Sequence, residues 1–581
     1  MRDPSILQRL KERKMVQWTL AYLAGAWVLV EFTSLLVTQF HWPEIIGQIV
    51  TVLAIFGLLV VLVIAWYHGE KGRQWVSGPE LLMIALLLLI AGGVLSMLGG
   101  DSERDAHVPS RDAADDRPGV AVLPCENISP DPADAYLAGG IHDEILLKLS
   151  KIAALRPIGR QSTEWFRANP SAPAEVASEL GASFIGECRV RKAGDRIRVT
   201  FQLSEVGTGS LLWAQEYDQD YTVENLFDMQ SAIAQQVADA MQAVVLPEER
   251  ARIETRPTES LQAYDLYLLG RSYWDRFSEA GFQRAIELFE EAIDADPEFA
   301  RAYAGVADSY ALLTQGWGQP PVEVFPRVRE AAEKALDLDP DLAEAHASLG
   351  AVSLFFDWDL DAAVASLRRA IELDPNYTTA HHWLAICHMA RARHEEALEE
   401  ARRALALDPL SAYINMNMGY FLYVAGKYEE AEEHDLGALQ IFPEHPLIHA
   451  FMGLARIRLG RVQDAIEDLE KAVALAREDT LIPLPFLGYA YGLAGREEEA
   501  RGVLRRLHTL LEGQFVNPDY FSVVHLGLGE LDEAMEWLYQ AREARTDWAF
   551  WFPVDPVAYP LHEDARFVEL VREVGLEEAL R

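Results

Sequence analysis

Hydrophobic and polar residues follow three different patterns along the 581 residues of the chain. Long apolar runs come first, at residues 15–40, 45–67 and 81–98. Strands of alternating polarity and a few helices follow over residues 119–250, and paired amphipathic helices fill residues 261–545. These patterns predict a multidomain protein with three transmembrane α-helices, a small α/β domain and an all-α solenoid of repeats.

Each apolar run is close to the roughly 20 residues that a helix needs to cross a bilayer, so residues 15–98 are predicted to form three transmembrane helices. The basic residues 1–14 are predicted to be a cytoplasmic tail, and Lys71 and Arg73 place the second loop on the same side. Three crossings then put everything after Leu98 outside the cytoplasm. The predicted localisation is the inner membrane, with three passes, a cytoplasmic N-terminus and periplasmic C-terminal domains.

Glu31 is an ionisable residue inside the first apolar run. One interpretation is a buried polar contact, within the helix bundle or with another membrane protein, because charged groups in a membrane usually face a partner. The other is that Glu31 lies close enough to the outer interface to reach water. Proton transport is disfavoured because the predicted spans contain no second carboxylate or histidine that could relay a proton.

Residues 99–118 are polar, contain proline and lack apolar periodicity, which predicts a linker. Beyond it, GVAVLP is typical of a short buried strand, and Lys192-Ala193-Gly194-Asp195 is typical of the turn between two longer strands. We therefore predict a small α/β domain over residues 119–250. Its expected helices and later strands are residues 140–152 and 226–245 (helices) and 182–191, 196–205 and 211–217 (strands).

One phrase recurs along the helical part of the chain, and Pro375, Pro409 and Pro443 mark copies that are 34 residues apart. Small residues recur at fixed distances from these prolines, where two helix axes can approach closely. They are Ala385, Ala397, Ala404, Gly419, Ala431, Ala438, Gly453, Ala465 and Ala472. The segment resembles the tetratricopeptide repeat family, whose repeats are antiparallel helix pairs that stack on their neighbours. The resemblance implies about eight repeats over residues 261–545, followed by a capping segment at 546–581.

The α/β segment carries the phrases VAVLPCENIS, YLAGGIHDEILLKLSKI, LGASFIGECRVRKAGDRIRVTFQLSEVGTGSLLWAQEYD and LFDMQSAIAQQVADAM in order. They resemble the TolB amino-terminal-like domain of bacterial envelope proteins. The order of all segments is similar to that of bacterial membrane-anchored tetratricopeptide repeat proteins that carry this domain.

Two cysteines depart from the pattern of the TolB-like family, which usually has Phe at the place of Cys125 and a small residue at the place of Cys188. Cys125 ends the first predicted strand, and Cys188 lies in the strand expected to pair beside it. One hypothesis is a disulfide, in a compartment that permits oxidation. The alternative is two separate buried thiols that behave as small apolar side chains.

Composition and motifs narrow the functional classes. The formal net charge of −39 argues against a nucleic-acid partner, because phosphate binding needs clustered Lys and Arg. The chain lacks HExxH, P-loop, GxSxG and CxxC motifs, so we expect no catalytic, cofactor or metal site and no enzyme activity. Asp143 and Glu144 are explained as first-turn residues of a helix. His381 and His382 are adjacent and point to different helix faces, so they cannot easily share a metal.

The expected binding site is the concave face of the repeats, which the resemblance places on the first helix of each pair. Tyr and Met offer large, adaptable contact area there, which suits an extended or helical apolar peptide. The alternative is that these side chains only pack against the next repeat. The predicted groove residues are His382, Met389, Tyr413, Met416, Tyr420 and Tyr423.

These observations predict a non-enzymatic, membrane-anchored adaptor that binds protein or peptide partners in the cell envelope through the groove, on the periplasmic side. An alternative is a signalling component whose TolB-like and repeat parts sense a ligand and signal to a cytoplasmic partner. A third is an enzyme with an unrecognised site in the α/β domain.

Overall fold

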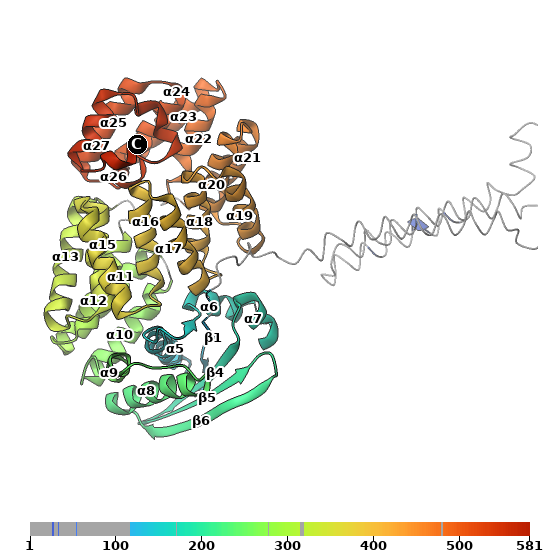
Figure 1. Cartoon of the computed structure of the whole chain (residues 1–581), viewed down its shortest axis with the longest axis vertical. Coiled ribbons are helices and arrows are strands. Elements are labelled where there is room, and N and C mark those ends of the chain that lie inside the picture. Colours follow the sequence, from blue (N-terminus) through green and yellow to red (C-terminus); the bar gives the residue numbers. More distant parts are fainter. Residues whose placement is uncertain are drawn as a thin grey trace, which may run out of the picture. The chain divides into compact units, whose positions relative to one another are not determined.

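The computed structural model describes residues 115, 117–169, 171–276, 278–313, 319–477 and 480–580, and five isolated earlier positions, Tyr22, Ala26, Trp27, Thr33 and Ala54. The chain divides into two compact units, Met1–His107 and Val108–Arg581. The second unit contains a small sheet domain and a long array of paired helices (Figure 1).

The prediction of membrane-spanning helices is corrected. No helix among the described residues is long and apolar enough to span a bilayer. The longest of them, Val223–Ala240 (α8) and Pro321–Leu338 (α13), have 18 residues each and carry charged side chains, whereas a span needs about 20 predominantly apolar residues. The expected spans at 15–98, with Glu31, lie outside the described residues apart from the five isolated positions. The three-pass inner-membrane localisation with periplasmic domains is therefore set aside.

The sheet has six strands in the order β3-β1-β4-β5-β6, with β2 beside β4. β1 is parallel to β3 and β4, and β4, β5 and β6 form an antiparallel meander. A two-residue turn joins β4 to β5, and Gly194 supplies the positive φ of 61° that such a turn needs. The strands are Gly119–Val122 (β1), Glu126–Asn127 (β2), Arg156–Pro157 (β3), Phe184–Ala193 (β4), Arg196–Glu205 (β5) and Ser210–Asp220 (β6).

Helices cover the sheet because its strands alternate apolar residues between two faces. Val120 and Val122 of β1 belong to the core that also contains residues of α5 and α8, whereas Ala121 packs with residues of α7 in a second cluster. The structure joins Cys125 and Cys188 in a disulfide with a Cα separation of 4.5 Å, and Cys387 is free and buried. The remaining helices of this domain are Pro132–Asp134 (η1), Ala135–Ser150 (α5), Arg160–Ala168 (α6), Pro173–Leu180 (α7) and Pro247–Glu254 (α9).

Eight consecutive helix pairs follow in the described residues. Their short turns need a left-handed residue, which is Gly426 (φ 76°) and Gly460 (φ 78°) in two adjacent repeats and Ala392 (φ 56°) in the repeat before them. The pairs are Leu261–Trp274 (α10) and Glu279–Ala295 (α11), Ala300–Leu313 (α12) and α13, Ala343–Val352 (α14) and Leu360–Leu373 (α15), Thr378–Ala390 (α16) and His394–Leu407 (α17), Ala412–Val424 (α18) and Tyr428–Ile441 (α19), Pro446–Arg458 (α20) and Val462–Leu475 (α21), Pro483–Leu493 (α22) and Glu497–Leu511 (α23), and Pro518–Leu528 (α24) and Leu531–Ala544 (α25).

The array is irregular at one place and ends in a folded segment. α14 continues into a π-helical turn, Ser353–Asp357 (η2), and Trp358 then takes a left-handed conformation with φ 61°. The C-terminal segment, residues 545–580, packs on α16, α24 and α25. Its helices are Trp548–Trp551 (α26), Pro556–Leu561 (η3), Ala565–Glu573 (α27) and Glu577–Leu580 (η4).

Candidate functional site

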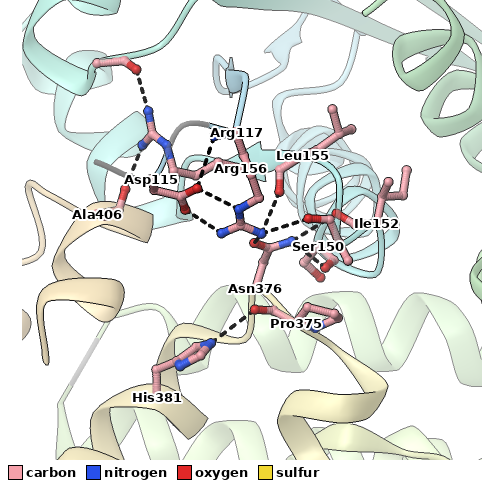
Figure 2. A network of polar contacts seen from close by, with 12 residues as sticks. Asp115, Arg117, Ser150, Ile152, Leu155, Arg156, Pro375, Asn376, His381 and Ala406 are labelled. Carbon is pink, nitrogen blue, oxygen red and sulfur yellow. Dashed lines mark hydrogen bonds and ion pairs between the residues drawn. The ribbon is translucent and has the colours of Figure 1, made fainter. Parts of the chain in front are cut away.

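The α/β domain contacts the solenoid through polar bonds to a loop between two repeats. Ser150 Oγ at the end of α5 donates to Asp374 Oδ2 (2.6 Å), and Asn376 Nδ2 donates to the Ser150 carbonyl (2.8 Å). Arg117 Nη1 reaches the same amide, at 2.8 Å from Asn376 Oδ1, and also binds the Leu155 carbonyl at 3.0 Å (Figure 2). Burial raises the pKa of Asp374 to about 6, although the Ser150 hydroxyl opposes this shift.

The next loop along the array is bound in the same way. Asp408 lies 34 residues after Asp374 and accepts from the Ser162 backbone N–H (2.8 Å) and hydroxyl, near the start of α6. The Ser162 hydroxyl oxygen accepts from Leu410 N (2.8 Å), and Arg156 donates to the Ala406 carbonyl (2.8 Å). Burial raises the pKa of Asp408 to about 6 as well. Two successive repeats therefore present equivalent acidic loops to one domain.

The charged residues of α5 hold the domain against the first repeats. Glu144 is buried and forms an ion pair with Arg301 of α12 (2.8 Å). Asp143 pairs with Arg160, which also binds Asp275 of the first repeat (2.9 Å). His142 Nε2 binds the Val122 carbonyl (2.8 Å), and burial lowers the pKa of His142 to about 3. The structure thus uses these residues for packing and domain contacts. The prediction that Asp143 and Glu144 lie in the first turn of a helix is wrong, because α5 begins at Ala135 and places them in its middle.

The C-terminal segment reaches the inner helices of the solenoid through aromatic residues. Phe550 contacts Phe355 (ring centroids 5.3 Å apart), and Trp551 contacts Phe486 (6.5 Å). The side chains of Trp548 and Phe552 have no exposed surface. The segment is therefore part of the hydrophobic core rather than a loose tail.

One buried carboxylate fixes this segment to the predicted groove. Asp555 accepts hydrogen bonds from the hydroxyls of Tyr420 (2.8 Å) and Tyr423 (3.0 Å) and from the backbone N–H of Val557 (2.8 Å). Burial raises the pKa of Asp555 and raises the pKa of both tyrosines well above the ordinary value. The chain's own Asp555 thus occupies the hydroxyl groups that we expected to meet a partner.

The α/β domain and the C-terminal segment both border a cavity of about 1420 Å³ that the inner helices also line, and we call them the α/β wall and the C-terminal wall of this cavity. We call this space the lumen. The α/β domain contributes residues of α5 and α6, and the C-terminal segment contributes α26. Residues that border the lumen include Tyr136, Asp143, Arg160, Arg271, Trp274, Phe325, Phe355, Tyr377, Ile386, Phe421, Phe451, Phe486, Tyr520, Phe550 and Trp551.

The predicted groove residues divide into two groups. Met389, Tyr413, Met416 and Tyr420 border the lumen. His382 does not, because it is buried against the rings of Tyr413 (4.9 Å) and Phe421 (5.8 Å), and burial lowers its pKa to about 3. Tyr423 is likewise buried, beneath Asp555.

Sequence reasoning did not identify Asp555, Phe550 and Trp551 as part of this site. The aromatic run WAFWF in residues 548–552 was the available signal, because so many large aromatic side chains in succession need a surface to cover.

The fold defines the class of the protein, a solenoid of paired helical repeats. Two family models, each described as Tetratricopeptide repeat, match residues 359–416 and 410–478. The prediction of tetratricopeptide repeats is thereby confirmed for this part of the chain.

A curated relative from Rhizobium meliloti (strain 1021), named "Putative adenylate cyclase 3", is 31% identical over 191 residues. The match covers 33% of this chain and 32% of that protein. The chain thus covers about a third of the length of the curated relative that it matches.

Solved structures also resemble parts of the chain. PilW, a type IV pilus biogenesis factor, is 19% identical with a TM-score of 0.31, and the match covers 38% of this chain and 98% of PilW. PilF of Pseudomonas aeruginosa is 24% identical with a TM-score of 0.26, over 42% of this chain and 99% of PilF.

Proposed function

We propose that the chain is a non-enzymatic adaptor that holds a segment of a partner protein in the lumen. The observation that supports this function is the cavity of about 1420 Å³, whose lining includes aromatic and methionine side chains on the inner faces of the repeats. Such side chains bind apolar segments with little sequence restriction, because they are large and adaptable.

The size of the lumen supports a peptide rather than a single small molecule. Pockets for small ligands measure about 300–1,000 Å³, which is less than the lumen. A helix with its side chains is about 10–12 Å wide and rises about 1.5 Å per residue, so the lumen corresponds to roughly ten helical residues. A short helix or an extended segment is therefore the expected occupant.

The α/β domain is proposed to be TolB amino-terminal-like, because its phrases match that family in order. In the adaptor its role is to close one side of the lumen, through the loops at Asp374 and Asp408.

Photo-crosslinking in cells tests the adaptor function. A benzophenone amino acid replaces Tyr413, which borders the lumen, or Leu436, which is 45% exposed on α19. The adaptor predicts a crosslinked partner protein at position 413 that is missing at position 436. Equal crosslinking at both positions, or crosslinking at 436 alone, contradicts the proposal.

A second candidate function is a signalling component that senses a ligand in the lumen and passes its state to a partner. The match to a relative named as an adenylate cyclase favours it. A ligand that changes hydrogen exchange of residues 545–561 without any crosslinked protein partner would favour this candidate over the adaptor.

A further inference from the structure

The outer strand of the sheet, β6, has a long open edge. Within the described residues it pairs with β5 alone, and all of its 11 residues are exposed or partly exposed. It lies at the outer margin of the sheet domain in Figure 1. Leu211 is 59% exposed and Leu212 is 40% exposed at its start. Unpaired edges of this length are templates for another strand.

The register shows which backbone groups face outward. Ala193 and Arg196 flank the two-residue turn and pair with each other. The backbone N–H and C=O groups of Arg196, Arg198 and the alternate residues after them are therefore directed toward β4. The backbone groups of the β5 residues between them are directed toward β6. Their partners on β6 are Trp213, Gln215, Tyr217 and Gln219.

The other β6 residues, Ala214, Glu216 and Asp218, therefore present their N–H and C=O groups to the open side, whereas the Asp220 carbonyl already accepts from Thr222 N (2.9 Å) and Asn225 Nδ2 (2.9 Å). A contact at Glu216 agrees with this direction, because its carbonyl accepts from the side chain of Gln215 at 3.2 Å.

The open edge is acidic on one face and aromatic on the other. Glu216, Asp218 and Asp220 lie on the face that is away from α8, and β6 contains no Lys or Arg. Asp218 binds Arg196 and Arg198 (both 2.5 Å), so two arginines face three carboxylates. On the other face Trp213 and Tyr217 pack partly against the core.

We propose that the β6 edge binds an extended basic segment of a partner protein, which adds an antiparallel strand to the sheet. Basic side chains of the segment lie opposite Glu216, Asp218 and Asp220, and its apolar side chains lie beside Trp213 and Tyr217. Main-chain bonds give the affinity and the alternate side chains give the specificity.

A second copy of this chain is disfavoured at the edge. It would place one acidic strand beside another, in a protein whose net charge is −39. The proposed site is separate from the lumen and does not depend on the function proposed for it.

A labelled ten-residue peptide of alternating Arg and Val tests the site by fluorescence anisotropy on the full chain. Residues opposite one another in an antiparallel hydrogen-bonded pair share a face, so the Arg residues point their N–H groups at β6. N-methylation of the Arg residues should weaken binding at least tenfold, whereas N-methylation of the Val residues should change it less than twofold. Equal effects of the two modifications would overturn the proposal.

Two variants complete the test. Ala214→Pro removes an outward N–H and leaves the ladder with β5 intact, since proline is tolerated on the solvent side of an edge strand. Glu216→Lys reverses one carboxylate. Each should weaken binding of the peptide at least fivefold. Glu429→Lys, at an exposed position in the first turn of α19, should not. Undiminished binding to both β6 variants, no binding of the peptide, or dimerisation of the chain through β6 would refute the site.

Discussion

The two walls of the lumen differ in how polar their contacts with the repeats are. The α/β wall combines apolar contacts, such as that of Phe227 with Tyr264 (ring centroids 4.7 Å apart), with hydrogen bonds and ion pairs at Asp374, Asp408 and Glu144. The C-terminal wall meets them through fully buried rings such as Trp548 and Phe552, with Asp555 as its buried polar anchor. The stabilising free energy of a polar interface is lost when one partner changes charge, whereas the free energy gained by burying large apolar side chains does not depend on pH. We therefore expect the contacts of the C-terminal wall, which we call the permanent wall, to depend less on pH than those of the α/β wall, which we call the polar wall.

The largest effect is expected at the permanent wall. Trp548→Ala removes a fully buried indole and should lower the free energy of unfolding by about 3–5 kcal/mol, as such cavities do. Denaturant unfolding followed by circular dichroism measures it. Tyr559→Ala is the control, because Tyr559 belongs to the same segment and is 41% exposed. Equal losses in the two variants would show that the C-terminal wall is not anchored by its buried rings.

A somewhat smaller loss is expected at the polar wall. Arg301→Ala leaves the buried carboxylate of Glu144 without its ion pair, which should cost about 3 kcal/mol, the lower end for broken buried pairs. Arg284→Ala breaks only exposed pairs on α11 and should cost less than about 0.5 kcal/mol. The same unfolding measurement compares them. A loss below about 1 kcal/mol in Arg301→Ala would mean that the ion pair does not hold the domain.

The disulfide within the domain of the polar wall should contribute next. Cys188→Ser opens a loop between residues 63 positions apart and should cost roughly 2–4 kcal/mol. Peptide mapping without reduction should recover residues 125 and 188 in one linked product and a single reactive thiol, Cys387, after denaturation. Three reactive thiols in the denatured, unreduced chain would contradict the bridge.

The smallest effect is a change in pH dependence at the polar wall. The folded chain holds the proton of Asp408 more tightly than the unfolded chain, with a pKa of about 6 against 3.8. This carboxyl therefore stabilises the fold fully below about pH 4, and its contribution is lost as the pH rises through about 6. Asp408→Asn should make the melting temperature fall less than in the wild type over this window.

Asp339→Asn is the matched control for that experiment. Asp339 precedes a proline in another repeat, as Asp408 does, and caps its own loop by accepting from Asp341 N (3.1 Å). Its substitution should leave the pH profile of the wild type unchanged. If Asp339→Asn flattened the profile as much as Asp408→Asn, the effect would belong to the repeats and not to the wall.

The local features of this fold could be predicted from sequence, because periodicity reports them directly. The 34-residue spacing of Pro375, Pro409 and Pro443 and the small residues between them predicted the paired helices. The alternation in residues 196–205 predicted a strand that the structure also contains. Long apolar runs predicted membrane helices on hydrophobicity alone, and that interpretation was wrong for the fold and the localisation.

The walls could not be predicted, because they depend on contacts between distant residues. Asp555 meets Tyr420 across 135 positions, and Asp408 meets Ser162 across 246. Neither contact leaves a periodic signal. His382 shows the same difficulty on a smaller scale, since its place on the first helix of a repeat predicted a groove position, and only packing shows that two neighbouring rings cover it.

The spacing of Asp374 and Asp408 has a mechanical consequence. Ser150 and Ser162 belong to one rigid domain and hold loops one repeat apart, so that domain fixes the rise and rotation between these two repeats. In helical-repeat arrays each repeat touches only its neighbours, so the rise and rotation between successive repeats can otherwise vary. Here one domain holds two successive repeats at a single rise and rotation.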